Sequence, residues 1–258
     1  MLRKLAAILI PTVFLAGAVL THGVLAWLCL AIWVLSSAVV MMGLLRPRSQ
    51  MFGKTLFQTA PQPRVALTFD DGPHPEDTPA ILEILEKEKA RATFFFVGCK
   101  ARQHPDLVRR VVDAGHEVAA HSDTHPWWFS LARKRRLRRE VGDCAATLCS
   151  LSGARPRFFR PPVGHKALSL EDVLREEGLE MVAWTVRAYD TLSLSAETIQ
   201  ARLLARAKPG GILLLHEGLS RREGSPSNSV RALRGVLRGL RERGLEPVTL
   251  RQLVGERP

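Results

Sequence analysis

The stretch Val65-Ala66-Leu67-Thr68-Phe69-Asp70-Asp71-Gly72-Pro73 joins an apolar run to a charged turn. An uninterrupted apolar run of this length is typical of a strand that is buried on both faces, as in parallel sheets. Two neighbouring carboxylates then enter a Gly-Pro turn. Because like charges repel, such a pair is costly unless a cation lies between the acids or one of them pairs elsewhere. We therefore expect a strand end with a functional role, although a solvated turn uses the same residue types.

Apolar runs alternate with amphipathic helical segments from Arg64 to the end of the chain. This alternation predicts an α/β fold with a parallel sheet. About seven strand–helix units are enough to close a barrel, and catalytic groups in such barrels lie where strands end and loops begin. We therefore predict a distorted (β/α)7 barrel. Its strands are expected at residues 65–69, 92–97, 117–120, 158–159, 181–186, 211–215 and 247–250.

The first fifty residues have the composition of a membrane segment. No Asp, Glu, Lys or Arg lies between Lys4 and Arg46, and Thr21-His22-Gly23 separates two apolar stretches at 5–20 and 24–45. A membrane-spanning helix needs ~20 apolar residues, which the second stretch provides. We predict an N-terminal transmembrane helical hairpin. The alternative is a cleaved signal peptide in the first stretch, followed by a single anchor.

Positive residues flank both ends of this apolar pair, with Arg3 and Lys4 before it and Arg46, Arg48 and Lys54 after it. By the positive-inside rule, both ends then lie in the cytoplasm. We expect a protein of a bacterial-type inner or plasma membrane whose large domain faces the cytoplasm.

The chain of 258 residues divides by composition into three parts. Residues 1–48 are the predicted transmembrane hairpin, residues 49–63 are a polar linker, and residues 64–258 are the large domain. The formal net charge is +12, from 37 Lys and Arg against 25 Asp and Glu. Such a charge favours an anionic partner. Since the chain has no nucleic-acid-reading motif, we expect a membrane surface or a phosphorylated substrate, and no nucleic acid.

A pair of histidines follows the predicted strand at 117–120, in His121-Ser122-Asp123-Thr124-His125. Two imidazoles four residues apart can reach one ion, together with a carboxylate from another strand end. Two histidines and one carboxylate leave open metal positions for water and substrate, as a catalytic site requires. Two histidines at this spacing more often have no shared function. The inference of a metal site therefore depends on their position at a strand end.

Three other strand ends bear polar residues. Arg160-Pro161-Pro162-Val163-Gly164 follows the strand at 158–159, and its prolines stiffen the loop that holds the arginine. His216 stands at the tip of an apolar strand, where it is either a general acid or base or a capped core residue. Asp190 follows the strand at 181–186.

The motifs at 68–73, 121–125 and 160–164, in this order, resemble those of the polysaccharide deacetylases. This family, also called carbohydrate esterase family four, includes the nodulation-type chitooligosaccharide deacetylases. The resemblance covers residues 64–253 and implies a distorted barrel of about seven strand–helix units. It makes residues 64–258 the catalytic domain.

The resemblance also implies roles for individual residues. Asp70 matches the general base, Arg160 the arginine that pairs with it, His216 the general acid, and Asp190 the acid that tunes this histidine. The metal ligands would be Asp71, His121 and His125, holding Zn²⁺ or another divalent ion such as Co²⁺ or Ni²⁺. The oxyanion and substrate loop would be Pro162, Val163 and Gly164, with the backbone N–H of Val163 as donor.

The chain departs from the family pattern at three positions near these motifs. Val163 stands where members commonly carry Tyr, Thr191 where they commonly carry Trp, and Arg187 where they often carry an acid or Asn. The predicted catalytic set is complete, so these changes bear on the substrate. They argue against a plain chitin or peptidoglycan enzyme.

An aromatic run, Pro126-Trp127-Trp128-Phe129, precedes a basic segment at 133–139. Aromatic residues beside a basic helix are typical of contact with a membrane interface. The alternative is that the aromatic residues pack in the core and the basic residues form a solvated face.

From these patterns we predict a monomeric, metal-dependent hydrolase at the membrane. It would remove an N-acyl group, acetyl or formyl, from an amino sugar that is part of a glycan or linked to a lipid. One alternative is an extracytoplasmic N-deacetylase of peptidoglycan or chitooligosaccharides. The other is an inactive, membrane-held carbohydrate-binding protein, which should lack the base, a ligand or the acid.

Overall fold

A curled sheet of parallel strands forms the centre of the computed structural model, which describes residues 2–192, 194–219 and 225–255. The strand order across the sheet is β1-β6-β5-β4-β3-β2-β8-β7, and β9 pairs with the start of β2. In chain order these strands are β1 (Thr55–Leu56), β2 (Arg64–Gly72), β3 (Thr93–Phe96), β4 (Glu117–Ala120), β5 (Phe158–Phe159), β6 (Glu180–Val182), β7 (Val186–Arg187), β8 (Ile212–His216) and β9 (Glu246–Val248).

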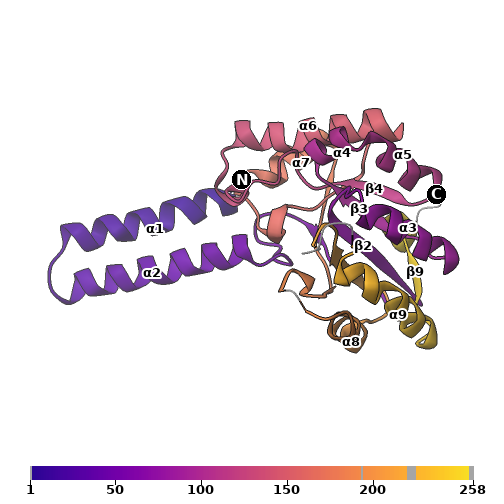
Figure 1. The fold of residues 1–258 in the computed structure, drawn as a ribbon. Helices are drawn as coiled ribbons and strands as arrows, with labels where there is room; N and C mark the ends of the chain where they lie inside the picture. Colours follow the sequence, from indigo (N-terminus) through magenta and orange to yellow (C-terminus); the bar gives the residue numbers. More distant parts are fainter. Residues whose placement is uncertain (1, 193, 220–224, 256–258) are drawn as a thin grey trace.

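Helices connect the strands and pack around the curled sheet; α5, α6 and α7 lie along one side of it, and α8 and α9 along the other (Figure 1). This arrangement confirms the predicted α/β class with a barrel-like parallel sheet. The helices are α3 (Asp77–Lys87), α4 (Gly98–Gln103), α5 (Pro105–Asp113), α6 (Lys134–Ser152), α7 (Leu170–Glu177), α8 (Ala196–Arg206), α9 (Asn228–Glu242) and α10 (Leu250–Leu253), with short 3₁₀ turns η1 (Phe129–Leu131), η2 (Pro162–Gly164) and η3 (Asp190–Leu192).

Both faces of the central strands are buried, which explains their continuous apolar sequence. Leu67 and Phe69 of β2 point into the core between sheet and helices, where the Phe69 ring stacks on that of Phe94 at 5.2 Å between centroids. Ala66 and Phe95 belong to a second apolar cluster on the opposite face. Packing on both faces fixes where β2 ends and so where its two aspartates emerge.

The strand predicted at 181–186 is two strands in the structure. β6 pairs with β5 and β1, whereas β7 pairs with β8. At Ala183, Trp184 and Thr185 the chain passes from one end of the sheet to the other, so the barrel is open between β1, which lies beside β6, and β7. A run of apolar residues does not reveal such a change of partner, because it is buried on either side of the break.

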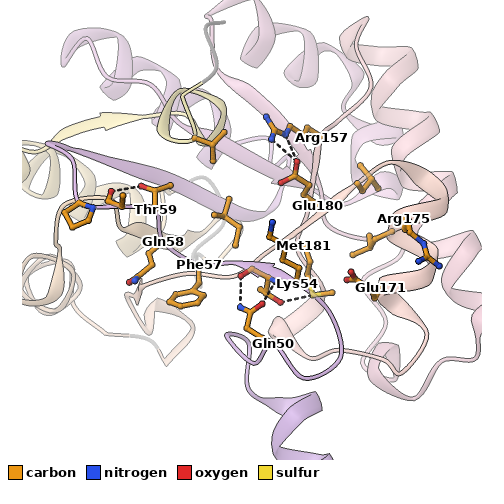
Figure 2. A pocket seen from close by; sticks show the side chains of 17 residues that line it. Gln50, Lys54, Phe57, Gln58, Thr59, Arg157, Glu171, Arg175, Glu180 and Met181 are labelled. Atoms are coloured by element: carbon orange, nitrogen blue, oxygen red, sulfur yellow. Dashed lines mark hydrogen bonds and ion pairs between the residues drawn. The ribbon is translucent and has the colours of Figure 1, made fainter. Parts of the chain in front are cut away.

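Residues 49–63, predicted as a linker, help to close this opening. β1 pairs with β6, Gln58 forms a bridge with Gly211, and the Thr185 hydroxyl donates to the carbonyl of Phe57 at 2.6 Å. Figure 2 shows this segment along a groove of about 1020 Å³, whose other wall comes from β6 and α7. The division of the chain into three parts stays a prediction.

The apolar N-terminus forms two helices, α1 (Leu2–Leu20) and α2 (Val24–Leu45), which lie side by side and extend away from the domain (Figure 1). The turn between them contains Gly23 at a φ of 67°, a conformation that favours glycine. Within the described residues, α2 alone is long and apolar enough to cross a membrane, by length and composition. The transmembrane hairpin therefore stays a prediction.

Candidate active site

The predicted functional side chains meet at one edge of the sheet, where the carboxyl ends of its parallel strands lie. β2 and β8 are neighbours, and their register sets Asp70 opposite His216. The other predicted residues come from the end of β2 and from loops beside this pair. They are Asp71 from β2, His121 and His125 from the loop after β4, Arg160 from the segment after β5, and Asp190 from η3.

Asp71, His121 and His125 form a group whose ligand atoms lie within 4.8 Å of one another. The Asp71 Oδ1 atom is 3.4 Å from the Nε2 atom of His121 and 3.2 Å from that of His125. The other ring nitrogen of His121 lies 2.7 Å from the carbonyl oxygen of Arg160, which turns Nε2 toward the carboxylate. Two imidazoles and one carboxylate are a donor set that suits a divalent cation such as zinc and leaves coordination positions open.

The electrostatics of this group also suit a cation. Burial would raise the pKa of Asp71, but the hydrogen bond and charge of His121 outweigh it, and the pKa lies well below its usual range. Burial lowers the pKa of His125, and the charge of His121 lowers it further. An ionised carboxylate and a neutral imidazole are the forms that bind metal. The residues therefore fit the predicted ion.

Asp70 is held by a fully buried arginine. The Nη1 atom of Arg160 donates to Asp70 Oδ1 at 2.5 Å and to the Thr68 hydroxyl at 2.9 Å, while Nη2 donates to the carbonyl of Ala183 at 3.2 Å. The guanidinium also lies over the Phe95 ring, 4.0 Å from its centroid. Burial lowers the pKa of Arg160, an effect that the charge of Asp70 opposes. The pair leaves Asp70 Oδ2 on the side of His121, 3.9 Å from Nε2.

His216, which stands opposite Asp70 in the register of β2 and β8, is paired with Asp190. Its Nδ1 atom lies 2.8 Å from Asp190 Oδ1, and Asp190 Oδ2 accepts from the His216 backbone N–H and the Ser229 hydroxyl, each at 2.8 Å. Burial lowers the pKa of His216, but the hydrogen bond and charge of Asp190 outweigh it and raise the pKa to about 9. A histidine of this kind holds a proton at neutral pH.

The loop Pro162–Gly164 borders a cavity of about 200 Å³ at this place. Val163 and Gly164 have φ angles of 58° and 75°. A Cβ on Gly164 would lie 2.5 Å from Trp184 Cη2 and 2.8 Å from Pro47 Cγ, so this position requires glycine. The lining residues are Asp70, Asp71, His121, His125, Val163, Gly164, Trp184, Arg187, Thr191, Leu214 and His216. The larger groove of Figure 2 contains none of the predicted site residues.

Several residues around the cavity were not foreseen from the sequence as parts of the site. Trp184 lines it from the break between β6 and β7, and Ser229 at the start of α9 supports Asp190. Arg48, directly after the hairpin, donates from its guanidinium to the carbonyls of Trp184 and Thr185. A sequence carries no signal for these contacts, because each joins residues that lie far apart along the chain.

Comparison with known proteins agrees with this geometry. Over 200 residues the chain is 37% identical to a chitooligosaccharide deacetylase of Bradyrhizobium sp. (strain ANU 289), which covers 73% of this chain and 90% of that protein. The sequence model of the family described as polysaccharide deacetylase matches residues 57–182. The chain belongs to the polysaccharide deacetylase family.

Two further relatives extend the comparison. A peptidoglycan-N-acetylglucosamine deacetylase of Bacillus cereus is 36% identical over 191 residues, which is 72% of this chain and 66% of that relative. The crystal structure of the Bc1960 peptidoglycan N-acetylglucosamine deacetylase superposes with a TM-score of 0.71 at 32% identity, covering 77% of this chain and 91% of that one.

Family membership confirms the predicted class of enzyme, a hydrolase of carbon–nitrogen bonds that acts as an N-deacetylase. Polysaccharide deacetylases depend in general on a divalent metal, and Asp71, His121 and His125 form a group able to hold one. The roles of the individual site residues stay predictions.

Proposed function

We propose that this polysaccharide deacetylase is a metal-dependent enzyme that removes an acetyl or formyl group from the nitrogen of an amino sugar at the membrane. The observation that carries the proposal is the placement of Asp70. Its Oδ1 atom is occupied by Arg160, while its Oδ2 atom lies on the side of the Asp71, His121 and His125 group. A base in this position can serve a water molecule that shares the cavity with the ion.

The proposed chemistry divides between the two sides of the cavity. A divalent ion held by Asp71, His121 and His125 would polarise the amide carbonyl and make a water molecule more acidic. Asp70 accepts the proton of the attacking water, and the hydrogen bond from Arg160 holds its carboxylate in place. The Val163 backbone N–H is proposed to donate to the developing oxyanion. His216, kept protonated by Asp190, gives its proton to the leaving amine.

The base assignment can be tested with purified full-length protein in detergent. We expect Asp70→Asn to lower turnover of an N-acetylglucosamine oligomer by roughly 10²–10⁴-fold, the usual contribution of a general base. Released acetate and the mass of the product measure it. The control is Asp113→Asn, which changes an exposed carboxylate on α5. Near-normal turnover by Asp70→Asn would show that the base is another group.

The relatives are named for chitooligosaccharide and peptidoglycan substrates, so a polymer of N-acetylglucosamine is one candidate. A specific observation favours a lipid-linked sugar phosphate. Arg187 lines the cavity, where the sequence departs from the family pattern, and its guanidinium stacks on Tyr189 at 4.1 Å. A cation in the cavity wall suits a substrate with a phosphate close to the acylated sugar. Mass spectrometry of lipid-linked and cell-wall glycans, with and without the protein, distinguishes the two.

The proposal includes α1 and α2 as the membrane anchor, with the catalytic domain on the cytoplasmic side. Its support is the apolar composition of α2 and the arginines and lysines that flank the pair. Reporters fused after Pro258 test the orientation. Activity of a cytoplasmic reporter is expected, and activity of alkaline phosphatase alone would instead place the domain outside the cytoplasm.

A further inference from the structure

Four large apolar side chains are exposed outside the hairpin, within the part of the chain that the structure describes. They are Trp127 at 87%, Leu131 at 77%, Leu192 at 62% and Val163 at 61% exposure. Single exposed apolar residues are common on soluble proteins, but contiguous exposed groups mark interaction surfaces. We call these four residues the apolar rim.

The four residues of the apolar rim stand in or next to segments that line the active-site cavity. Val163 lines the cavity itself, and Leu192 directly follows Thr191, which also lines it. Trp127 comes two residues after His125, another lining residue, and Leu131 ends the short turn η1 that follows. Three different loops that contribute to the cavity wall thus each carry an exposed apolar side chain. In the described part of the domain, no other large apolar side chain is exposed to this degree.

The end of α2 is fixed against the loop that carries Val163. Pro47 contacts Gly164, the neighbour of Val163, and the Lys166 backbone N–H donates to the carbonyl of Leu44 at 2.9 Å. One residue, Arg46, separates Leu45, the end of α2, from Pro47, and the two Cα–Cα steps between them span at most ~7 Å. If α2 crosses a membrane, the rim at Val163 therefore lies close to the membrane surface.

The charges beside the rim match an anionic surface. Arg133, Arg135 and Arg139 are exposed and form no ion pair within the described residues. Trp128 is partly covered by Arg136, whose guanidinium lies 5.0 Å from its ring centroid, and Phe129 is buried. Of the aromatic run that suggested a membrane contact, Trp127 alone is fully outward. Leu131 and Leu192, which also belong to the rim, were not singled out from the sequence.

We propose that the apolar rim enters the headgroup region of an anionic bilayer and opens the active-site cavity toward the membrane surface. The substrate that fits this arrangement is an amphiphile whose amino sugar is held at the bilayer by its own lipid. This inference rests on the proposed function and its membrane anchor. A glycan strand is the competing occupant, but sugar rings stack on aromatic faces, and three of the four rim residues are aliphatic.

The first test measures contact between Trp127 and lipid in the full chain. In a W27F/W33F background, which removes the tryptophans of the hairpin, the protein is reconstituted in vesicles of phosphatidylglycerol and brominated phosphatidylcholine. Bromine quenches indole fluorescence on contact. We expect clear quenching that is lost when W127F is added, because Trp184 is buried and Trp128 is covered. Absence of quenching, or quenching that a soluble chitooligosaccharide abolishes by covering Trp127, overturns the proposal.

The second test separates membrane contact from catalysis. We expect Leu131→Asp to raise KM for a lipid-linked N-acetylglucosamine in vesicles by on the order of tenfold, since one apolar contact with the interface is lost. Turnover of a water-soluble N-acetylglucosamine oligomer should not change. The matched control is Ala146→Asp, exposed on α6 and ~18 Å along the helix from Lys134. An equal loss on both substrates contradicts the proposal.

The two tests also separate this inference from the proposed activity. Quenching of Trp127 needs no turnover. If the lipid quenches Trp127 in a protein that shows no activity, the membrane contact of the rim is supported and the proposed N-deacylase activity is rejected. Activity on both substrates without quenching would do the reverse.

Discussion

The pairing of His216 with Asp190 makes a quantitative prediction for the variant Asp190→Asn. The carboxylate contacts the imidazole at 2.8 Å and carries the charge that keeps it protonated. Asparagine has the same shape but no charge, so the variant tests the electrostatic part of the pairing. The backbone N–H of His216 and the Ser229 hydroxyl keep an oxygen acceptor in the variant.

The size of the effect follows from the pKa of His216. It is raised from 6.5 to about 9, a shift of about 2.5, which corresponds to roughly 3 kcal/mol in favour of the protonated form. Burial opposes this shift, so without the charge of Asp190 the pKa should fall to near or below 6.5. A general acid acts while it is protonated, and its activity is lost as the pH rises through its pKa. At pH 8 the variant should therefore be slower by on the order of 30-fold.

The assay is the pH dependence of kcat for the full-length enzyme with an N-acetylglucosamine oligomer. We expect the alkaline limb of Asp190→Asn to lie about 2.5 pH units below that of the wild type, while the two rates approach each other near pH 6. A bound cation shifts both limbs in the same direction, so their separation carries the test. Ser229→Ala, which removes a hydrogen bond and no charge, is the control. Unchanged alkaline limbs in Asp190→Asn would refute the role of His216 as the acid.

Three further predictions concern Arg48 at the break between β6 and β7, the buried acid Glu217 next to His216, and the metal site. Arg48→Ala should lower kcat by on the order of tenfold with unchanged zinc content, because Arg48 holds the backbone at the break between β6 and β7. The control is Arg46→Ala, an exposed residue of the same segment, which should have little effect on kcat. Burial raises the pKa of Glu217 from 4.5 to about 8, so the folded protein loses stability as the pH rises from 4.5 to 8. Glu217→Gln should therefore raise the free energy of unfolding at pH 8 by up to about 4 kcal/mol, and leave it unchanged at pH 4.5, in urea titrations. Asp71→Asn should weaken zinc binding, measured by chelator competition, by more than roughly 100-fold, and Asp123→Asn should not.

Each of these predictions has a contrary result. Equal kcat losses in Arg48→Ala and Arg46→Ala would mean that the charge of the segment matters and the contact does not. A stability gain for Glu217→Gln that is independent of pH would point to packing. Zinc binding that survives in Asp71→Asn would move the metal site away from His121 and His125.

The residue types of the site could be predicted because each motif directly follows an apolar strand. Such a strand must be buried, and parallel strands end at one edge of a sheet, so Asp70, His121 and His216 had to emerge near one another. The structure places them together with Asp71 and His125 as expected.

Other parts of the structure left no trace in the local pattern. Residues 49–63 have the polar composition of a linker, yet β1 within them pairs with β6. The run at 181–186 reads as one strand, yet it changes partner at Trp184. In both cases the local sequence permits the structure, and a pairing partner distant in the chain selects it.

By itself the sequence determined which polar residues stand at which strand ends, because a residue that directly follows a buried strand must emerge where that strand ends. Tertiary structure alone decided that Pro47 rests on Gly164, that Arg48 holds the backbone beside Trp184, and that Leu131 and Leu192 are exposed as Trp127 is. These relations join loops and a helix end that are distant along the chain. They depend on how the sheet curls, which is a property of all its packing contacts together and of no single segment.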